Sequence, residues 1–146
     1  MSHPENVFMN FFKEIFTLEQ LARNRMERAL PDDMKVSHFT ALSYLVKKDT
    51  PSSPAELASA FQVTRPTMTN TLQKLEAKNY VCVSADLEDG RGKQVMITQQ
   101  GKDAFHLAVQ SLAEMFGDVA NAMGEEPFKE ALIPLTNIRA LMDTSR

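Results

Sequence analysis

Two helix-start signals follow each other closely in the middle of the chain, and they constrain its fold more than any other feature. Ser53 precedes Pro54, and Glu56 follows three residues after the serine, which is the pattern of a capped helix with proline in its first turn. Thr64 and Pro66 repeat this pattern. The second signal leaves room for only about two turns of the first helix. The segment therefore predicts two short helices joined by a tight turn.

The hydrophobic spacing changes directly after the second of these helices. Its apolar residues recur at helical spacing, and Asn79 marks its end. Residues 80–85 and 94–97 then alternate as strands do, and a polar, glycine-bearing segment separates them. The predicted fold class is mainly α with a small β-hairpin wing, which is a winged helix-turn-helix.

Longer helices are expected on both sides of this unit. Residues 7–30 carry a wide apolar stripe, and a second helix is expected to begin with Ser37 as its N-cap. Thr98 is expected to cap a long helix that reaches a turn at 124–127. A final helix contains Pro134, which should kink or split it.

Charge is unevenly distributed along the chain. The formal net charge is −3, which on its own opposes binding to a polyanion. Residues 35–93, however, hold eight basic and six acidic side chains, whereas residues 1–34 hold four and six and residues 94–146 hold four and seven. The middle third is therefore the only net basic part, as a DNA-facing segment between acidic flanks would be.

Several classes of protein find no support in the sequence. No apolar run approaches the roughly 20 residues that span a bilayer, and no secretory signal pattern is present, so a cytoplasmic protein without membrane contact is expected. No catalytic grouping or phosphate loop appears, so neither an enzyme nor a cofactor is predicted. His3, His38 and His106 form no close-spaced ligand set, and no metal site is predicted. Cys82 stands between two valines of a strand, which favours packing over a redox role.

The second short helix carries polar and basic side chains suited to the major groove. Arginine can pair with guanine, asparagine and glutamine with adenine, and threonine methyl groups can touch thymine. An ordinary solvated helix face would have a similar composition, but the tight turn and the hairpin around it favour DNA contact. The candidate DNA-binding residues of the two short helices are Ser53, at the start of the first, and Thr64, Arg65, Thr67, Thr69, Asn70, Gln73 and Lys74 of the second. The hairpin adds Arg91 and Lys93, for phosphates or an adjacent minor groove.

These residues carry a resemblance that covers nearly the whole chain. The sequence resembles the MarR family of bacterial transcriptional regulators most strongly from Val63 to Gly101. The matching stretches are Val63–Thr69, Leu72–Glu76, Asp89-Gly90-Arg91 and Ile97–Gly101. The chain departs from the family at Asn79, where members often have glycine, and at Ser84 and Ala85, where many carry a basic residue.

The resemblance implies roles and boundaries for this chain. Asp89 would brace Arg91 for DNA contact, and the terminal helices of two subunits would intertwine as a dimer. Residues 1–146 would form a single MarR-like domain, with a winged-helix DNA-binding region at 35–98 and dimerisation helices at 1–34 and 99–146. Small aromatic compounds are the effectors that the family implies. Phe16, His38 and Tyr44 are candidates for an effector pocket, although aromatic residues of this kind are more often simply part of a core.

The sequence thus predicts a sequence-specific DNA-binding transcriptional regulator. Its expected action is that of a ligand-responsive repressor, working as a homodimer on a pseudo-palindromic operator of double-stranded DNA. Two alternatives stay open. One is a protein-binding winged-helix interaction module, and the other is a metal-responsive regulator of the same fold.

Overall fold

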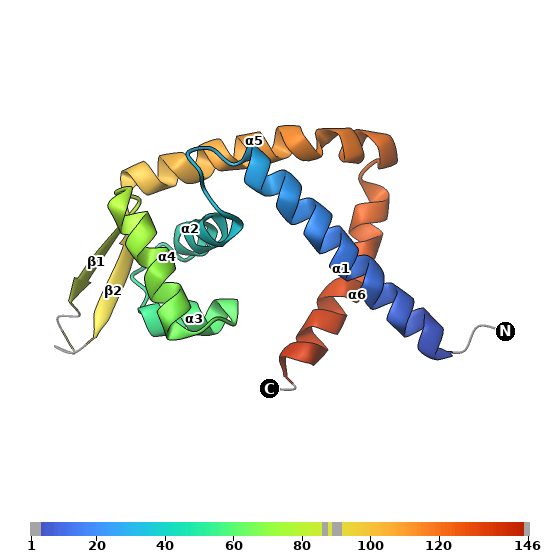
Figure 1. Ribbon diagram of the computed structural model, residues 1–146, viewed down its shortest axis with the longest axis horizontal. Helices are drawn as coiled ribbons and strands as arrows, with labels where there is room; N and C mark the ends of the chain where they lie inside the picture. The colour runs from blue at the N-terminus through green and yellow to red at the C-terminus, as the bar shows by residue number, and fades with distance from the viewer. Residues whose placement is uncertain (1–3, 86–87, 89–91, 145–146) are drawn as a thin grey trace. The chain divides into compact units, whose positions relative to one another are not determined.

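The computed structural model describes residues 4–85, 88 and 92–144. Its elements in chain order are α1 (Pro4–Ala29), α2 (Val36–Lys48), α3 (Pro54–Phe61), α4 (Arg65–Ala77), β1 (Val81–Ala85), β2 (Lys93–Ile97), α5 (Gln99–Met123) and α6 (Glu126–Asp143) (Figure 1). The predicted fold class, mainly α with one β-hairpin, is confirmed. The chain divides into two compact units between Leu112 and Ala113, inside α5.

The expected start signals of three helices are confirmed. Ser53 Oγ accepts a hydrogen bond from the Glu56 N–H at 3.1 Å at the start of α3, and Thr64 Oγ1 accepts from the Thr67 N–H at 3.2 Å at the start of α4. Thr98 Oγ1 accepts from the Gly101 N–H at 3.0 Å at the start of α5. Each cap satisfies a backbone donor that the first helical turn leaves without an intrahelical partner.

The expected start of α2 is wrong by two residues. Lys35, not Ser37, is the N-cap, and Ser37 lies inside the helix, where its carbonyl accepts from the Thr40 hydroxyl. His38 does the capping work instead, because its Nδ1 accepts the Lys35 backbone N–H at 3.2 Å. His38 thus takes the part that Glu or Gln plays at the third helical position of a capping box, where the side chain accepts the N-cap backbone N–H.

Two residues in the left-handed region of φ shape the helix-turn-helix. Gln62 has φ 60° between α3 and α4, and Asn79 has φ 60° after α4. Beyond Asn79 the Tyr80 N–H returns to the Leu75 carbonyl at 3.0 Å, which closes the end of the helix. Asparagine tolerates this conformation better than most residues do, so the stop expected at Asn79 is confirmed.

The hairpin is a two-stranded antiparallel sheet with Val81 opposite Ile97 and Val83 opposite Val95. Val95 also pairs on its other side with Ser52, since the two residues exchange backbone hydrogen bonds of 3.0 and 2.8 Å. In the described part of the chain β2 therefore has a partner on both sides, and β1 is the outer strand.

The expected packing of Cys82 is wrong. Cys82 lies opposite Met96 in the hairpin, and both side chains are exposed. Successive strand residues point to opposite faces, so the burial of Val81 sends Cys82 to the solvent side.

A hydrophobic core joins α2, α3, α4, the hairpin and the first half of α5. Its buried apolar residues include Leu42, Leu45, Leu57, Met68, Leu72, Leu75, Val81, Val95 and Ala108. Gly101 belongs to the same packing, because a Cβ at this position would overlap the Tyr80 carbonyl oxygen. The core thus fixes α4 and the base of the hairpin relative to each other.

The helix α6 has a different character. It contains no buried residue, although Phe128, Leu132, Ile133 and Leu135 are large and apolar. It continues through Pro134 without a break, so the split expected there does not occur. None of the described helices has the length and apolar character needed to cross a membrane.

Candidate nucleic-acid interface

The helix α4 divides into a buried and an exposed face. Met68, Thr71, Leu72 and Leu75 are buried against the core. The exposed side chains include all of the candidate DNA-binding residues of this helix, which are Arg65, Thr67, Thr69, Asn70, Gln73 and Lys74. The predicted candidates on α4 therefore share one solvent-facing surface, which we call the α4 polar face.

The N-terminal turn of α4 brings two of the predicted hydroxyls together. Thr64 Oγ1 lies 2.8 Å from Thr67 Oγ1 and also caps the helix. Arg65 is exposed at the first helical position. Ser53 lies at the corresponding place in α3, where its hydroxyl is occupied by capping. The hydroxyls of Ser53 and Thr64 are thus both engaged in helix capping. Arg65 is the side chain of this turn that is suited to direct base contact.

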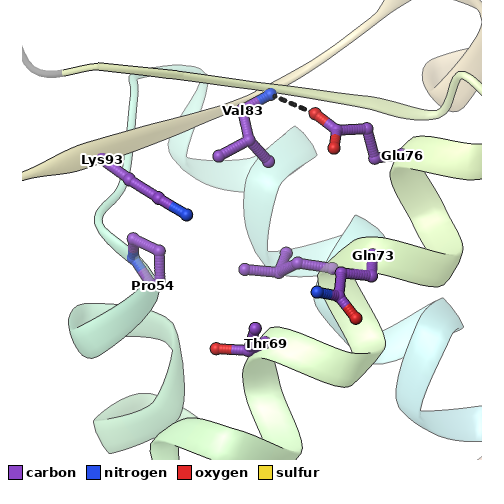
Figure 2. A pocket seen from close by; sticks show the side chains of 7 residues that line it. Pro54, Thr69, Gln73, Glu76, Val83 and Lys93 are labelled. Atoms are coloured by element: carbon purple, nitrogen blue, oxygen red, sulfur yellow. Dashed lines mark hydrogen bonds between the residues drawn. The ribbon is translucent and has the colours of Figure 1, made fainter.

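Three further predicted residues meet in a hollow between α4 and the hairpin. Thr69 and Gln73 of α4 and Lys93 of β2 line it, and its volume is about 140 Å³. Its other lining residues are Pro54, Leu72, Glu76 and Val83. Figure 2 shows the side chains of Lys93 and Gln73 turned toward this space. A wing residue and two residues of the α4 polar face therefore border the same opening.

Glu76 and Val83 are the members of this hollow that the sequence analysis missed as functional residues. Glu76 Oε2 accepts a hydrogen bond from the Val83 backbone N–H at 3.1 Å, which links α4 to β1. The spacing of Thr69, Gln73 and Glu76 places them along one side of α4. This spacing is the sequence signal that could have grouped Glu76 with the two predicted residues.

Lys74 lies on another flank of α4, toward the start of α2. Burial lowers the pKa of His38 below its ordinary value of 6.5, and the positive charges of Lys78, Lys74 and Lys35 lower it further. A neutral His38 is also what the hydrogen bond from the Lys35 N–H to Nδ1 requires. The flank of α4 that carries Lys74 is therefore electropositive.

Two residues of the predicted wing contact lie outside the described residues. These two residues are Asp89 and Arg91, and their expected pairing stays a prediction. Lys93 is the described candidate of the wing, and it is exposed as the first residue of β2.

The three residues predicted for an effector pocket have different environments. Phe16 on α1 is 68% exposed, whereas His38 on α2 is buried. Tyr44 packs edge-on against Phe61, with ring centroids 5.6 Å apart, and donates to Glu56 at 3.4 Å. None of the three lines the hollow beside α4.

Tyr44 takes part in a polar contact between α2 and α3. Glu56 accepts a hydrogen bond from Lys48, and this bond is the main reason why the pKa of Glu56 is lowered and that of Lys48 is raised. The Ser53 backbone lowers the pKa of Glu56 further, as a capping box would. The Tyr44 hydroxyl therefore contributes to a hydrogen-bonded group with Glu56 and Lys48 that links α2 and α3.

Among the residues that the structure describes, no three His, Cys, Asp or Glu side chains are grouped so as to hold a metal ion. His38 is buried as described above, and His106 is exposed on α5.

Comparison with known proteins places this architecture among solved transcriptional regulators. Residues 32–92 match the sequence model of the MarR family. This match begins inside the connection between α1 and α2 and ends at the residue before β2. A search of curated protein sequences finds no match.

Solved structures extend the likeness to nearly the whole chain. The transcriptional regulator BldR from Sulfolobus solfataricus has a TM-score of 0.79 at 22% identity, over 95% of this chain and 99% of that one. A mutant of MarR from E. coli, complexed with operator DNA, has a TM-score of 0.78 at 19% identity, over 94% and 99%. A mutant of MepR from S. aureus, bound to an oligodeoxyribonucleotide, has a TM-score of 0.59 at 23% identity, over 92% and 97%. At these identities the likeness shows a shared fold. Residues 32–92 thus resemble the MarR family, and the chain as a whole shares the winged-helix fold of these solved regulators.

Proposed function

We propose that the protein is a sequence-specific DNA-binding transcriptional regulator that acts as a homodimer on a pseudo-palindromic operator. The observation that carries this proposal is the α4 polar face. Its six candidate side chains are all exposed, while the opposite side of the helix is anchored in the core. A helix that enters a major groove needs this combination of a rigid seat and free polar side chains.

The charge distribution supports the same function. Residues 35–93 hold eight basic and six acidic side chains and are the only net basic third of the chain, and Arg65, Lys74 and Lys93 are exposed within them. Neutralisation of phosphates by such side chains supplies most of the sequence-independent affinity of DNA-binding proteins. The acidic segments on either side would then lie away from the DNA.

Exposed apolar side chains support the homodimer. They occur on α1 and on α6, where Phe8, Phe16, Leu132 and Ile133 are each more than half exposed. A second copy of the chain would cover such surfaces and would place two recognition helices about 34 Å apart, one turn of DNA. Binding of such a dimer across a promoter would repress transcription.

Effector response is the remaining part of the proposal. Phe16, His38 and Tyr44 are the proposed pocket residues, and small aromatic compounds are the proposed effector class. Effector binding would shift the dimer toward a spacing of the recognition helices that fits the operator poorly. The aromatic surface of Phe16 supports this idea, because its side chain is open to a ligand or a partner.

The test is a selection of bound sequences from a random duplex pool, followed by titrations of the selected duplex at several salt concentrations. We expect a two-fold symmetric consensus and affinity that falls steeply with salt. Arg65→Ala should cost about 1–3 kcal/mol and relax the preference at one position of each half-site. Arg28→Ala, which removes one exposed arginine from α1, is the matched control.

A second variant separates base contact from phosphate contact. Arg91→Ala should weaken binding to all sequences and reduce the salt slope by about 1. Retention of parental binding by both arginine variants would contradict the site assignment. Absence of any selected sequence, or binding independent of salt, would favour a protein-binding winged-helix module. Stoichiometric zinc in the purified protein would favour a metal-responsive regulator.

The effector part needs its own measurement. The operator titration is repeated with a panel of phenolic and benzoic compounds, using the parent and Phe16→Ala. We expect at least one compound to weaken operator binding by the parent and to have less effect on the variant. Equal release from both proteins would exclude Phe16 from the effector site.

A further inference from the structure

The two strands of the wing are held in different ways. Val95 of β2 exchanges two backbone hydrogen bonds with Ser52, so this strand is fixed to the chain segment that precedes α3. β1 is the outer strand of the described sheet, and an outer strand presents unpaired N–H groups along its free edge. The orientation of the wing therefore depends on what holds that edge.

The carboxylate of Glu76 on α4 is bonded to this edge of β1. Glu76 Oε2 accepts the Val83 N–H at 3.1 Å, and Figure 2 shows this bond spanning the gap between α4 and β1. A hydrogen bond to an ionised acceptor is about twice as strong as one between neutral groups. Val83 occupies the middle of β1, so the contact acts beyond the base of the hairpin, where the core already fixes the chain.

The same contact borders the hollow that the predicted DNA-contacting residues share. Thr69 and Gln73 precede Glu76 along one side of α4, and Lys93 approaches from β2. The relative placement of Lys93 and these two side chains depends on the angle between wing and helix. A bond between Glu76 and β1 limits that angle.

We infer that Glu76 is a positioning residue, which holds the wing against α4 so that both engage DNA as one rigid unit. This inference rests on the proposed function, because it assigns a role within the DNA interface. It concerns a residue whose charge has the wrong sign for a phosphate contact.

The negative charge of Glu76 makes the inference testable. A carboxylate beside DNA repels the phosphates, so its removal from a plain surface should raise affinity, whichever neutral residue replaces it. A positioning role predicts a different pattern. Gln keeps an acceptor oxygen for the Val83 N–H, whereas Ala removes it.

The experiment compares Glu76→Gln with Glu76→Ala on the selected operator. We expect Glu76→Gln to bind at least as tightly as the parent. We expect Glu76→Ala to bind about fivefold to tenfold more weakly than Glu76→Gln, with a smaller salt slope, because the freed wing loses phosphate contacts. Equal or tighter binding by Glu76→Ala, with the slope unchanged, would overturn the inference.

A measurement without DNA tests the inference independently of the proposed function. Hydrogen exchange of the Val83 amide should be at least about tenfold faster in Glu76→Ala than in the parent or in Glu76→Gln. The Val95 amide, bound to the Ser52 carbonyl at 2.8 Å, is the internal control. If the parent binds no DNA but Val83 exchange responds in this way, the proposed function fails and the hold on the wing stands. Unchanged Val83 exchange would overturn the inference, whatever the DNA titrations give.

Discussion

The helices α4 and α6 differ in where their apolar side chains lie. α4 buries its apolar residues in the core and exposes polar ones. α6 buries none of its residues, and Leu132, Ile133 and Leu141 are each more than half exposed. Both helices have an apolar side, but only that of α4 is covered within the chain.

This difference shows which surfaces are complete in a single copy of the chain. The α4 surface is polar and can face water until DNA replaces the water. The α6 surface exposes apolar area, whose burial is worth about 25 cal/mol per Å². We therefore expect changes in the α4 region to act on the fold and on DNA contact, and changes on α6 to act on assembly.

The largest effect should come from a charge on the apolar side of α6. Leu132→Glu should prevent dimerisation without unfolding the monomer, because Leu132 is 57% exposed within the chain. Loss of the second recognition helix should lower operator affinity by about 100-fold or more. Sedimentation analysis and operator titration measure the two effects.

Asn137→Glu is the matched control, because it adds the same charge to another exposed position of α6. It should stay dimeric and bind like the parent. If Leu132→Glu also stays dimeric, α6 is not the assembly surface, and the comparison with α4 loses its meaning.

The same contrast between packed and open positions is found at two glycines of α5. A Cβ at Gly101 would overlap the Tyr80 carbonyl oxygen and lie 2.9 Å from Ile97 Cγ1, whereas a Cβ at Gly117 meets nothing within 4 Å. Gly101→Ala should therefore destabilise the fold by about 1–3 kcal/mol, as overpacking does. Gly117→Ala should stabilise it by about 0.5–1 kcal/mol, because alanine favours helix. Urea unfolding measures both, and similar changes in the two variants would contradict the packing described here.

Much of this fold was predictable because local signals and core packing agree. Ser53, Thr64 and Thr98 cap helices where the sequence placed caps, and Asn79 adopts the left-handed conformation expected of it. The candidate residues of α4 fall on one exposed surface, because the helical period alone separates them from the buried residues.

The errors arose where tertiary contacts or strand geometry decide. His38 caps α2 through a ring nitrogen, which no serine-based pattern anticipates. Cys82 is exposed because strand alternation gives it the face opposite its valine neighbours. The role of Glu76 depends on a backbone N–H of another element, which the sequence of α4 does not reveal.

A smaller effect should appear as a pH dependence of stability through His38. The unfolded chain binds a proton at this histidine near pH 6.5, whereas burial and the nearby lysine charges keep its pKa lower in the folded state. As pH falls below about 6.5 the unfolded state therefore binds more protons, and the free energy of unfolding decreases by at most about 1.4 kcal/mol per pH unit.

His38→Gln should show a weaker decrease between pH 7.5 and 5.5 than the parent. Urea unfolding at the two pH values measures the decrease in each protein, and identical decreases in the parent and in His38→Gln would show that His38 does not titrate differently in the folded state.

The smallest effect concerns the link between the α1–α2 connection and the base of the wing. The Tyr80 hydroxyl donates to Asp32 Oδ2 at 3.2 Å, and Lys78 donates to the Asp32 carbonyl. Tyr80→Phe keeps the buried ring and loses one hydrogen bond, so it should cost about 0.5–1.5 kcal/mol. Tyr44→Phe, which loses a 3.4 Å bond at a less buried position, should cost less.

Alkaline titration gives Tyr80→Phe a second, independent readout. Burial raises the pKa of Tyr80, and the charge of Asp32 raises it further, so the folded state keeps the phenol protonated at pH values where the unfolded state loses the proton. Stability from this group is therefore full below about pH 10 and declines above it. Tyr80→Phe should flatten this decline, whereas a pure packing role of the ring would leave the alkaline slope as in the parent. Since α6 has no buried residue, its variants should keep the parental alkaline slope, so the pH dependence separates the packed region around Tyr80 from the surface that we propose for assembly.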